Sequence, residues 1–307
     1  MSSLRPILNG KSAGQPRVRE AVKAVRADGH RVEVRVTWEA GDVERMTAEA
    51  LADAASGHLD TIVAGGGDGT INGVFGAVAS SPSPKLCTLG ILPLGTASDF
   101  AHAAGLPVAD LTACLRIAAD GPARDMDIGV LDGRPFINLL SGGFGSRVTV
   151  ETDPELKRRL GGLAYVLTGL ARLKDLTASR GRFRAENFEW EGPFLAIAIG
   201  NGRQAGGGIA LCPDALVNDG KLDLMILPDL AVAQRDDVLG QLLRDGAMGI
   251  GALQHTARSA WIEYESDEEL HINLDGEPMR SRKFRVECRP GALSVRLGNS
   301  PLLRAAA

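Results

Sequence analysis

A glycine-rich loop around an aspartate is the first part of this sequence whose residue types could do chemistry. The run AGGGDGTIN, from Ala64 to Asn72, follows a short apolar stretch and precedes a helical pattern. Backbone N–H groups at such a helix start can bind an anion such as phosphate. The loop lacks both the third glycine of a dinucleotide-binding fingerprint and the lysine of a Walker loop. The residues alone therefore leave two interpretations open, a phosphate-binding loop and a tight structural turn.

Asp68 lies in the middle of this loop, where its negative charge would repel a bare phosphate. Magnesium, which accompanies nucleotide phosphates, prefers hard oxygen ligands such as a carboxylate. Asp68 is therefore placed to contact that ion directly or through water. A loop that binds magnesium-nucleotide can use the carboxylate that a plain phosphate loop should avoid.

Four other loops contain residues of interest. In LPLGTASDF, the hydroxyl of Thr96 is placed to cap the next helix while it reaches a phosphate oxygen, and a simple N-cap is the alternative. In HINLDGEP, Asp-Gly between two strands predicts a hairpin turn, with Glu277 as a solvated residue beside it. In LVNDGK, the Asn-Asp-Gly sequence predicts a turn that leads into the strand KLDLMIL. The glycines of GNGRQAGGG allow close approach, either between domains or to a substrate.

The elements that must position these loops differ between the two parts of the chain. Up to about residue 128, short apolar runs alternate with helical patterns, as in RPILNG followed by PRVREAVKAVRADG. This alternation predicts a mostly parallel sheet with helices on both faces. In such sheets ligands bind at the carboxyl ends of the strands. Thr37, Gly65 to Thr70, and Gly95-Thr96 all follow predicted strands, so we expect them to converge on one crevice.

From about residue 129 the pattern predicts strands broken by Gly, Asp and Pro turns, and hence a largely antiparallel β domain. Two helical insertions are predicted, near 154–175 and 230–247. The first is amphipathic, with basic residues near its ends. It could face a membrane surface, or it could pack on the core with a solvated basic rim.

Composition narrows the class of protein. The 307 residues include 34 basic and 38 acidic side chains, with a formal net charge of -4, which argues against nucleic-acid binding. The four cysteines are far apart and form no metal motif, so we expect reduced thiols in a cytosolic protein. The start lacks a signal-peptide pattern, and no uncharged stretch reaches the roughly 20 residues of a membrane span. Any membrane contact is therefore expected from the cytosolic side, and to be reversible.

The motifs together resemble a known family. GGGDGTIN combined with ILPLGTASDFA resembles the bacterial lipid kinases of the diacylglycerol-kinase catalytic family, of the YegS type. The similarity extends to ILNGKS, RVTWEAGD, GNGRQAGGG, LCPDALVNDGKLDL and NLDGEP, and so spans nearly the whole chain. GGDGT alone is less specific, because NAD kinases have a similar loop.

The resemblance implies an α/β fold in two domains with the active site in the cleft between them. Residues 1–128 would form the nucleotide-binding domain, with its mostly parallel sheet. Residues 129–292 would form a β-sandwich-like, largely antiparallel substrate domain. Residues 293–307 would return to the first domain.

The resemblance also implies roles for single residues. Glu277 matches the general base, which would take the proton of a lipid hydroxyl as it attacks the γ-phosphorus. The structural metal loop of the family corresponds to the Asp219 carboxylate and the backbone carbonyls of Leu216 and Lys221. The matching nucleotide-binding positions are Thr37, Gly67, Asp68, Gly69, Thr70, Ile71, Asn72, Gly73 and Thr96.

Two positions depart from the family pattern. Ser98 stands where the family usually has Asn, and Gly73 stands where it usually has Glu. Ser98 can still cap or form a hydrogen bond, although with a shorter reach. Gly73 removes a carboxylate near the loop.

The sequence therefore predicts an ATP-dependent lipid kinase that transfers the γ-phosphate to phosphatidylglycerol or diacylglycerol with Mg²⁺. Glu277 and Asp68 would be its catalytic residues, and Mg²⁺ or Ca²⁺ would occupy the structural site. Its partners would be ATP and a lipid at the cytosolic membrane surface, which places it in the cytoplasm and at the inner membrane face. An NAD kinase-like enzyme and a catalytically silent nucleotide- or lipid-binding regulator are the alternatives.

Overall fold

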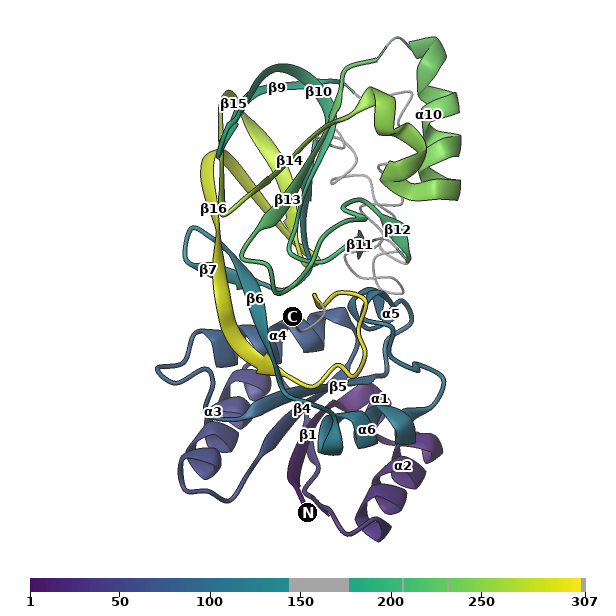
Figure 1. Ribbon diagram of the computed structural model, residues 1–307, viewed down its shortest axis with the longest axis vertical. Coiled ribbons are helices and arrows are strands. Elements are labelled where there is room, and N and C mark those ends of the chain that lie inside the picture. Colours follow the sequence, from purple (N-terminus) through teal and green to yellow (C-terminus); the bar gives the residue numbers. More distant parts are fainter. Residues whose placement is uncertain (144–176, 206, 231, 305–307) are drawn as a thin grey trace. The chain divides into compact units, whose positions relative to one another are not determined.

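The computed structural model describes residues 1–143, 177–205, 207–230 and 232–304, which form two compact units (Figure 1). The first unit comprises Met1–Ile128 and Pro290–Ala307, and the second comprises Gly129–Arg289. The chain therefore leaves the first unit once and returns to it near its end. The amphipathic helix predicted near 154–175 lies outside the described residues.

The first unit is built on a parallel sheet. Its strands are β1 (Ser3–Asn9), β2 (Arg31–Val32), β3 (Arg35–Thr37), β4 (Thr61–Gly66) and β5 (Thr88–Pro93). β1 pairs in parallel with β2, β3 and β4, and β4 pairs in parallel with β5. Every residue of β4 is buried, as expected for a strand that is covered on both faces.

Helices cover this sheet. They are α1 (Gly10–Ala13), α2 (Pro16–Ala27), α3 (Asp42–Ala55), α4 (Asp68–Ala79), α5 (Asp99–Ala103) and α6 (Leu111–Asp120). Helix α2 packs against α6, and α3 packs against α4. In Figure 1 these two pairs lie on opposite sides of the sheet. The buried face of α2 consists of Val18, Ala21, Val22 and Val25, the apolar positions that give this helix its period.

The end of the chain completes the first unit. Strand β16 (Glu277–Val295) enters it, and Val295 pairs in parallel with Leu89 of β5. The guanidinium group of Arg296 then donates to the carbonyl oxygens of Ala118, at 3.3 Å, and Ala119, near the end of α6. A cation at a helix C-terminus is favourable because carbonyl groups without partners gather there.

The second unit is an antiparallel sheet. Its strands are β7 (Arg134–Phe136), β8 (Leu139–Gly142), β9 (Ser179–Ala185), β10 (Phe188–Gly200), β13 (Leu222–Pro228), β14 (His255–Ser259), β15 (Trp261–Leu274) and most of β16. β6 (Arg124–Leu131) leads into it, and a small ribbon joins β11 (Gln204–Ala205) to β12 (Ile209–Ala210). The strand order is β14-β13-β10-β8-β15-β16, and β9 also pairs with β10 and β15.

Both faces of this sheet are apolar. Along β10, Ile197 and Ile199 join a core that is centred on Phe183, Phe194 and Tyr264. The intervening Ala196 and Ala198 face a second core on the other side. Helix α10 (Val232–Asp245) and the 3₁₀ segment η2 (Gly246–Leu253) contribute to that second core. A strand that is buried on both faces has a continuous apolar sequence. This burial explains the apolar runs FLAIAIG in β10 and LDLMIL in β13.

Candidate functional site

The glycine loop joins β4 to α4, with Gly67 at the N-cap position and Asp68 as the first helical residue. Two of its glycines are required by packing. A Cβ at Gly65 would lie 2.2 Å from Leu8 Cδ2, and a Cβ at Gly66 would lie 2.3 Å from Thr70 Oγ1. Gly69 differs, because no atom from elsewhere in the described residues, beyond its chain neighbours and the nearby backbone of α4, lies within 4 Å of its Cβ position. The space beside the backbone of Gly69 is therefore open.

The glycine loop and the loop after β5 touch each other through their backbones. A Cβ on Gly95 would lie only 2.4 Å from Gly67 Cα. The Asp68 carboxylate fastens the same contact, because it accepts the N–H groups of Asp99 and Phe100, both at 3.1 Å. The expected roles of Asp68 were to bind the nucleotide and magnesium and to act in catalysis, and Gly95 was expected only to lie at the same crevice. The structure adds a further task for Asp68, which is to hold the two loops together.

The start of α5 differs from the expected capping arrangement. The N-cap residue is Ser98, not Thr96, and Ser98 makes no side-chain cap bond. Asp68 instead supplies the acceptors for the first N–H groups of α5. Thr96 is exposed, and its hydroxyl therefore does not serve as the cap of this helix.

Ser98 adopts a left-handed backbone conformation, with φ of 49°, and it is buried. Asn tolerates this conformation better than most residues, which gives a physical reason for the Asn usual in the family. The Ser98 hydroxyl donates to the Gly95 carbonyl at 3.2 Å. The serine therefore holds the turn from within, with a shorter side chain.

Thr37 lies at the same edge of the sheet as the glycine loop. It pairs with Asn9 in register, and a Cβ on Gly10 would lie 2.4 Å from its carbonyl oxygen. The Thr37 hydroxyl donates to the Leu8 carbonyl at 3.4 Å, and Asn9 Nδ2 donates to Thr70 Oγ1 at 3.5 Å. The ends of β1, β3, β4 and β5 are thus linked at the edge of the sheet where the three loops are expected to converge.

Asp42, which was not among the predicted site residues, fixes the turn that follows Thr37. Its carboxylate accepts the N–H groups of Trp38, at 2.6 Å, and Glu39, at 3.0 Å, and pairs with Arg45 at 2.6 Å. The bond from Trp38, followed by those from Arg45 and Glu39, lowers the pKa of Asp42 to about 2. The carboxylate of RVTWEAGD is the signal that could have revealed this cap, because Asp and Asn often bond to nearby backbone N–H groups.

The remaining predicted positions lie in the first turns of α4. Ile71 is fully buried, so only its backbone is available to a ligand. The Oδ1 atom of Asn72 is buried and has no hydrogen-bond partner among the described residues. Gly73 faces α3, because its Cβ position lies 3.2 Å from Val43 Cγ1. A larger residue at position 73 would therefore press on Val43.

In the second unit, Glu277 follows a two-residue hairpin turn. Leu274 pairs with Glu277, and Asp275 and Gly276 between them have φ of 46° and 100°. This is the turn that Asp-Gly predicts. Glu277 is exposed, so its carboxylate is accessible to solvent. Within the described ranges, its side chain forms no hydrogen bond or ion pair.

The predicted metal loop precedes β13. The side chain of Asp219 is almost fully buried, and its carboxylate pairs with Arg258 and accepts the N–H of Lys221 at 3.1 Å. Leu216, three positions earlier in the sequence, is half-buried. No group of three His, Cys, Asp or Glu side chains suited to a metal occurs in the part of the chain that the structure describes. A cation would therefore rely on backbone oxygens as well as on Asp219.

Asp223 adds negative charge near this loop. Burial, above all, raises the pKa of Asp223 to about 6, Arg258 opposes the rise, and the carboxylates of Asp219 and Asp214 add to it. Its Oδ2 atom is buried without a partner among the described residues. Asp223, at the start of β13, thus adds a carboxylate oxygen that arginine does not satisfy, and oxygen donors of this kind fit a hard cation.

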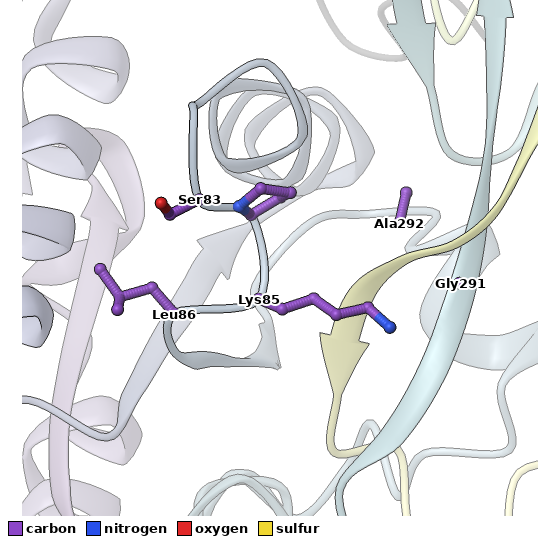
Figure 2. Close-up of a pocket in the computed structure, with 6 residues that line it drawn as sticks. Ser83, Lys85, Leu86, Gly291 and Ala292 are labelled. Carbon is purple, nitrogen blue, oxygen red and sulfur yellow. The ribbon is translucent and has the colours of Figure 1, made fainter.

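A surface recess of about 470 Å³ in the first unit is a separate feature (Figure 2). It is lined by Ser83, Pro84, Lys85, Leu86, Gly291 and Ala292. Lys85 pairs with Asp125 at 2.9 Å. The recess adjoins the segment that precedes β5, whereas the linked loops follow the strands. It is therefore not part of the candidate site.

The described residues contain no helix that is both long and apolar enough to cross a membrane.

Comparison with known proteins identifies the class to which this fold and these loops belong. Residues 4–131 match the diacylglycerol kinase catalytic domain. Residues 138–297 match the YegS C-terminal NAD kinase beta sandwich-like domain. A solved structure of a diacylglycerol kinase from Bacillus anthracis strain Sterne superimposes with a TM-score of 0.76 at 21% identity, covering 96% of each chain. That likeness shows a shared two-domain fold.

Relatives with higher sequence identity show to which subfamily of these kinases the chain belongs. A protein of Pseudomonas aeruginosa strain UCBPP-PA14, named "Probable lipid kinase YegS-like", is 50% identical over 301 residues, covering 97% of this chain and 95% of the relative. A protein of the same name from Xanthomonas euvesicatoria is 47% identical over 312 residues, covering 98% of both chains. The chain therefore belongs to the YegS-type lipid kinases, which are phosphotransferases with a diacylglycerol kinase catalytic domain. This family is the one that the sequence motifs predicted.

Proposed function

We propose that this protein transfers the γ-phosphate of ATP to the hydroxyl group of a lipid, either phosphatidylglycerol or diacylglycerol, in a reaction that requires Mg²⁺. Family membership supports the lipid kinase class. The observation that carries the finer proposal is the contact between two loops at one edge of the first unit's sheet, Gly67 against Gly95, which Asp68 holds together. Phosphoryl transfer needs mainly positioning and charge neutralisation, and a rigid loop edge serves the first need.

The first unit would bind the nucleotide. The residues involved would be Thr37, Gly67, Asp68, Gly69, Thr70, Ile71, Asn72, Gly73 and Thr96. Two observations support the fit: the open space beside Gly69 and the buried Asn72 Oδ1 atom that lacks a donor. A buried acceptor without a partner is costly, so a donor from a ligand would be favourable there. Magnesium-ATP, when bound, would supply the phosphoryl group and neutralise the developing charge.

Asp68 would combine two tasks. Its two oxygens each accept one backbone N–H group, and a carboxylate offers about four lone-pair positions. Oxygen capacity therefore remains for magnesium, directly or through water. The bonds from α5 would keep the carboxylate oriented.

Glu277 would be the general base in the second unit. Its exposed carboxylate would accept the proton of the lipid hydroxyl, and the active site would lie between residues 1–128 and 129–292. A general base of this kind typically contributes a factor of about 10² to 10⁴ in rate. The acceptor lipid would be reached from the cytoplasm, at the inner face of the membrane.

One assay separates the lipid kinase from its alternatives. Labelled ATP and magnesium are offered with diacylglycerol, phosphatidylglycerol or NAD. Label in a lipid supports the proposal, and label in NADP would instead support an NAD kinase-like enzyme. Absence of label from all three would support a catalytically silent regulator. Mass spectrometry of the product from total bacterial lipid identifies the acceptor.

The base is tested with Glu277→Gln, which preserves shape and removes the proton acceptor. We expect transfer to fall by about 10² to 10⁴, while nucleotide binding, measured by calorimetry, stays within twofold. Turnover like that of the wild type would refute the assignment.

A structural metal would bind the loop of Leu216, Asp219 and Lys221 in the second unit. The excess carboxylate oxygen near Asp223 supports a cation there. Mg²⁺ and Ca²⁺ both suit oxygen ligands. The ion would stabilise the loop without taking part in phosphoryl transfer.

A further inference from the structure

The backbone before Glu277 is held by the carboxylate of Asp275, a residue without a role in the proposed transfer. Asp275 accepts three consecutive N–H groups of the β7–β8 connection, from Ile137 at 2.8 Å, Asn138 at 3.2 Å and Leu139 at 2.7 Å. Its own N–H donates to the Leu139 carbonyl at 3.0 Å. Hydrogen bonds to an ionised acceptor are roughly twice as strong as neutral ones. Asp275 therefore ties the turn firmly to this connection.

The turn is also braced from its other side. Asn273 Oδ1 accepts the Gly276 N–H at 2.8 Å. Both turn residues have positive φ, a conformation that Asp and Gly tolerate. Local conformation and hydrogen bonding thus support the same turn.

The connection to which Asp275 binds is itself fixed by the loop of GNGRQ. The Asn138 carbonyl accepts the N–H groups of Asn201 and Gly202, at 3.0 and 2.8 Å. Asn138 Nδ2 donates to the Gln204 carbonyl at 2.7 Å. A Cβ on Gly202 would lie 2.2 Å from Asn138 Oδ1. This glycine therefore serves close packing within the second unit.

We propose that Asp275 is a positioning residue for Glu277, a conclusion that rests on the proposed function of Glu277 as the base. The Glu277 side chain forms no hydrogen bond or ion pair within the described ranges, so its place depends on its backbone. That backbone follows directly from the turn that Asp275 holds. A base must come within hydrogen-bond reach of its proton, and a misplacement of about 1 Å can reduce the rate about 100-fold.

The chain contains a matched control for this turn. Asp132 and Gly133 form another two-residue Asp-Gly turn of the second unit, between Leu131 and Arg134, with φ of 45° and 87°. Asp132 also accepts a backbone N–H, from Arg285 at 3.2 Å. It shares the sequence and conformation of the Asp275 turn, but it does not precede the proposed base.

The test compares Asp275→Asn with Asp132→Asn in the full-length protein. Asn tolerates positive φ, so both variants keep the turn, whereas at position 275 an NH₂ group replaces one of the acceptor oxygens. Transfer is measured with labelled ATP, magnesium and total bacterial lipid in mixed micelles. We expect Asp275→Asn to lower kcat about 10- to 100-fold with the KM for ATP within twofold. We expect Asp132→Asn to leave both within twofold.

Gly202→Ala gives a second, independent perturbation, because the new methyl group presses on Asn138 without altering Asp275. We expect a several-fold loss of kcat and again an unchanged KM for ATP. Gly202→Ala becomes the test of the inference if Asp275→Asn does not fold, as judged by circular dichroism and a thermal melt.

The inference is overturned if folded Asp275→Asn keeps kcat within threefold of the wild type, or if Asp132→Asn loses as much. If Asp275→Asn does not fold, an unchanged kcat in Gly202→Ala overturns it. Glu277→Gln distinguishes this failure from failure of the proposed function. If Glu277→Gln is active, Glu277 is not the base, and both the proposed function of Glu277 and the inference about Asp275 fail. If Glu277→Gln is inactive and Asp275→Asn is fully active, only the inference about Asp275 fails.

Discussion

In the first unit, the glycine loop after β4 and the loop after β5 meet through backbone atoms. Gly67 and Gly95 approach through their backbones, and a Cβ on Gly95 would lie 2.4 Å from Gly67 Cα, too close for any side chain at position 95. Asp68 then binds the start of α5 from the opposite loop. These contacts join residues about thirty positions apart, and they make the loops one structural feature.

Replacing Gly95 by Ala should separate the loops. The new Cβ would meet backbone rather than a movable side chain, and such overpacking typically costs about 1–3 kcal/mol. We expect a lower free energy of unfolding in urea together with weaker nucleotide binding by calorimetry.

Gly69→Ala is the matched variant in the same loop. Its Cβ enters open space, and Ala is preferred over Gly in a helix by about 1 kcal/mol. We expect unchanged or higher stability, with nucleotide affinity lowered at least tenfold because the methyl group occupies space assigned to phosphate. Normal affinity in Gly69→Ala would contradict that assignment.

Among the elements, the turn between β3 and α3 is held by one carboxylate. The pKa of Asp42 is lowered to about 2 in the folded protein, from an ordinary value of 3.8. A lowered pKa in the folded state means that the charged form stabilises the fold. This stabilisation is complete above about pH 4 and is lost as the pH falls through 4 towards 2.

Asp42→Asn should therefore lower the melting temperature at pH 7, and the difference from the wild type should shrink between pH 4 and pH 2. Thermal melts across this range measure it. Glu49→Gln is the control, because Glu49 binds the same Arg45, at 2.9 Å, from an exposed position. An exposed pair contributes little, so this variant should stay close to the wild type. A constant Asp42→Asn difference at all pH values would contradict the explanation.

The loop before β13 should respond to divalent cations. Ca²⁺ or Mg²⁺ that binds only the folded state stabilises it, by about 2.7 kcal/mol at a hundred times Kd. We expect added metal to raise, and EDTA to lower, the melting temperature of the wild type. Asp219→Asn should abolish the response, whereas Asp267→Asn, on an exposed part of β15, should keep it.

Arg258→Met sharpens the same test. Arg258 occupies the Asp219 carboxylate, so its removal leaves that charge to the cation. We expect a larger metal-induced rise in melting temperature than in the wild type. An equal response of all four proteins would show that the cation acts elsewhere.

The elements could be predicted because they depend on local pattern. The period of α2 and the buried run of β4 follow from residues within a few positions of each other. The hairpin turn before Glu277 could also be predicted, since Asp-Gly strongly favours a two-residue turn of this kind. The bonds of Asp68 to α5, of Asp42 to the turn after Thr37, and of Asp275 to the β7–β8 connection could not be predicted in the same way. Each depends on which backbone N–H groups the fold leaves without partners.

At the scale of the whole molecule, the first unit is made from two separate parts of the chain. Its second part is tied to the first by the pairing of Val295 with Leu89 and by the bonds of Arg296 to α6. Both contacts are made after β16 has passed through the second unit. The first unit thus depends on residues at the far end of the sequence.

Removing this tie should destabilise the first unit. Arg296→Met removes the Arg296 donor from the carbonyl oxygens of Ala118 and Ala119. The Ser2 hydroxyl still donates to Ala119 at 2.9 Å, so the main loss is at Ala118, where an unsatisfied buried group costs about 1–3 kcal/mol. Urea unfolding followed by circular dichroism measures the loss. Arg289→Met, at an exposed position of β16, should change stability by less than about 0.5 kcal/mol. Equal effects of the two variants would refute the role of Arg296.

The late return of the chain has a consequence for biosynthesis. A ribosome adds about 5–20 residues per second, so the second unit takes on the order of ten to thirty seconds to make after residue 128 has been translated. During that time the nascent first unit lacks Val295 beside Leu89, and the last carbonyl groups of α6 lack Arg296. The linked loops of the first unit would therefore be translated early but reach their final stability only after Val295 and Arg296 have left the ribosome.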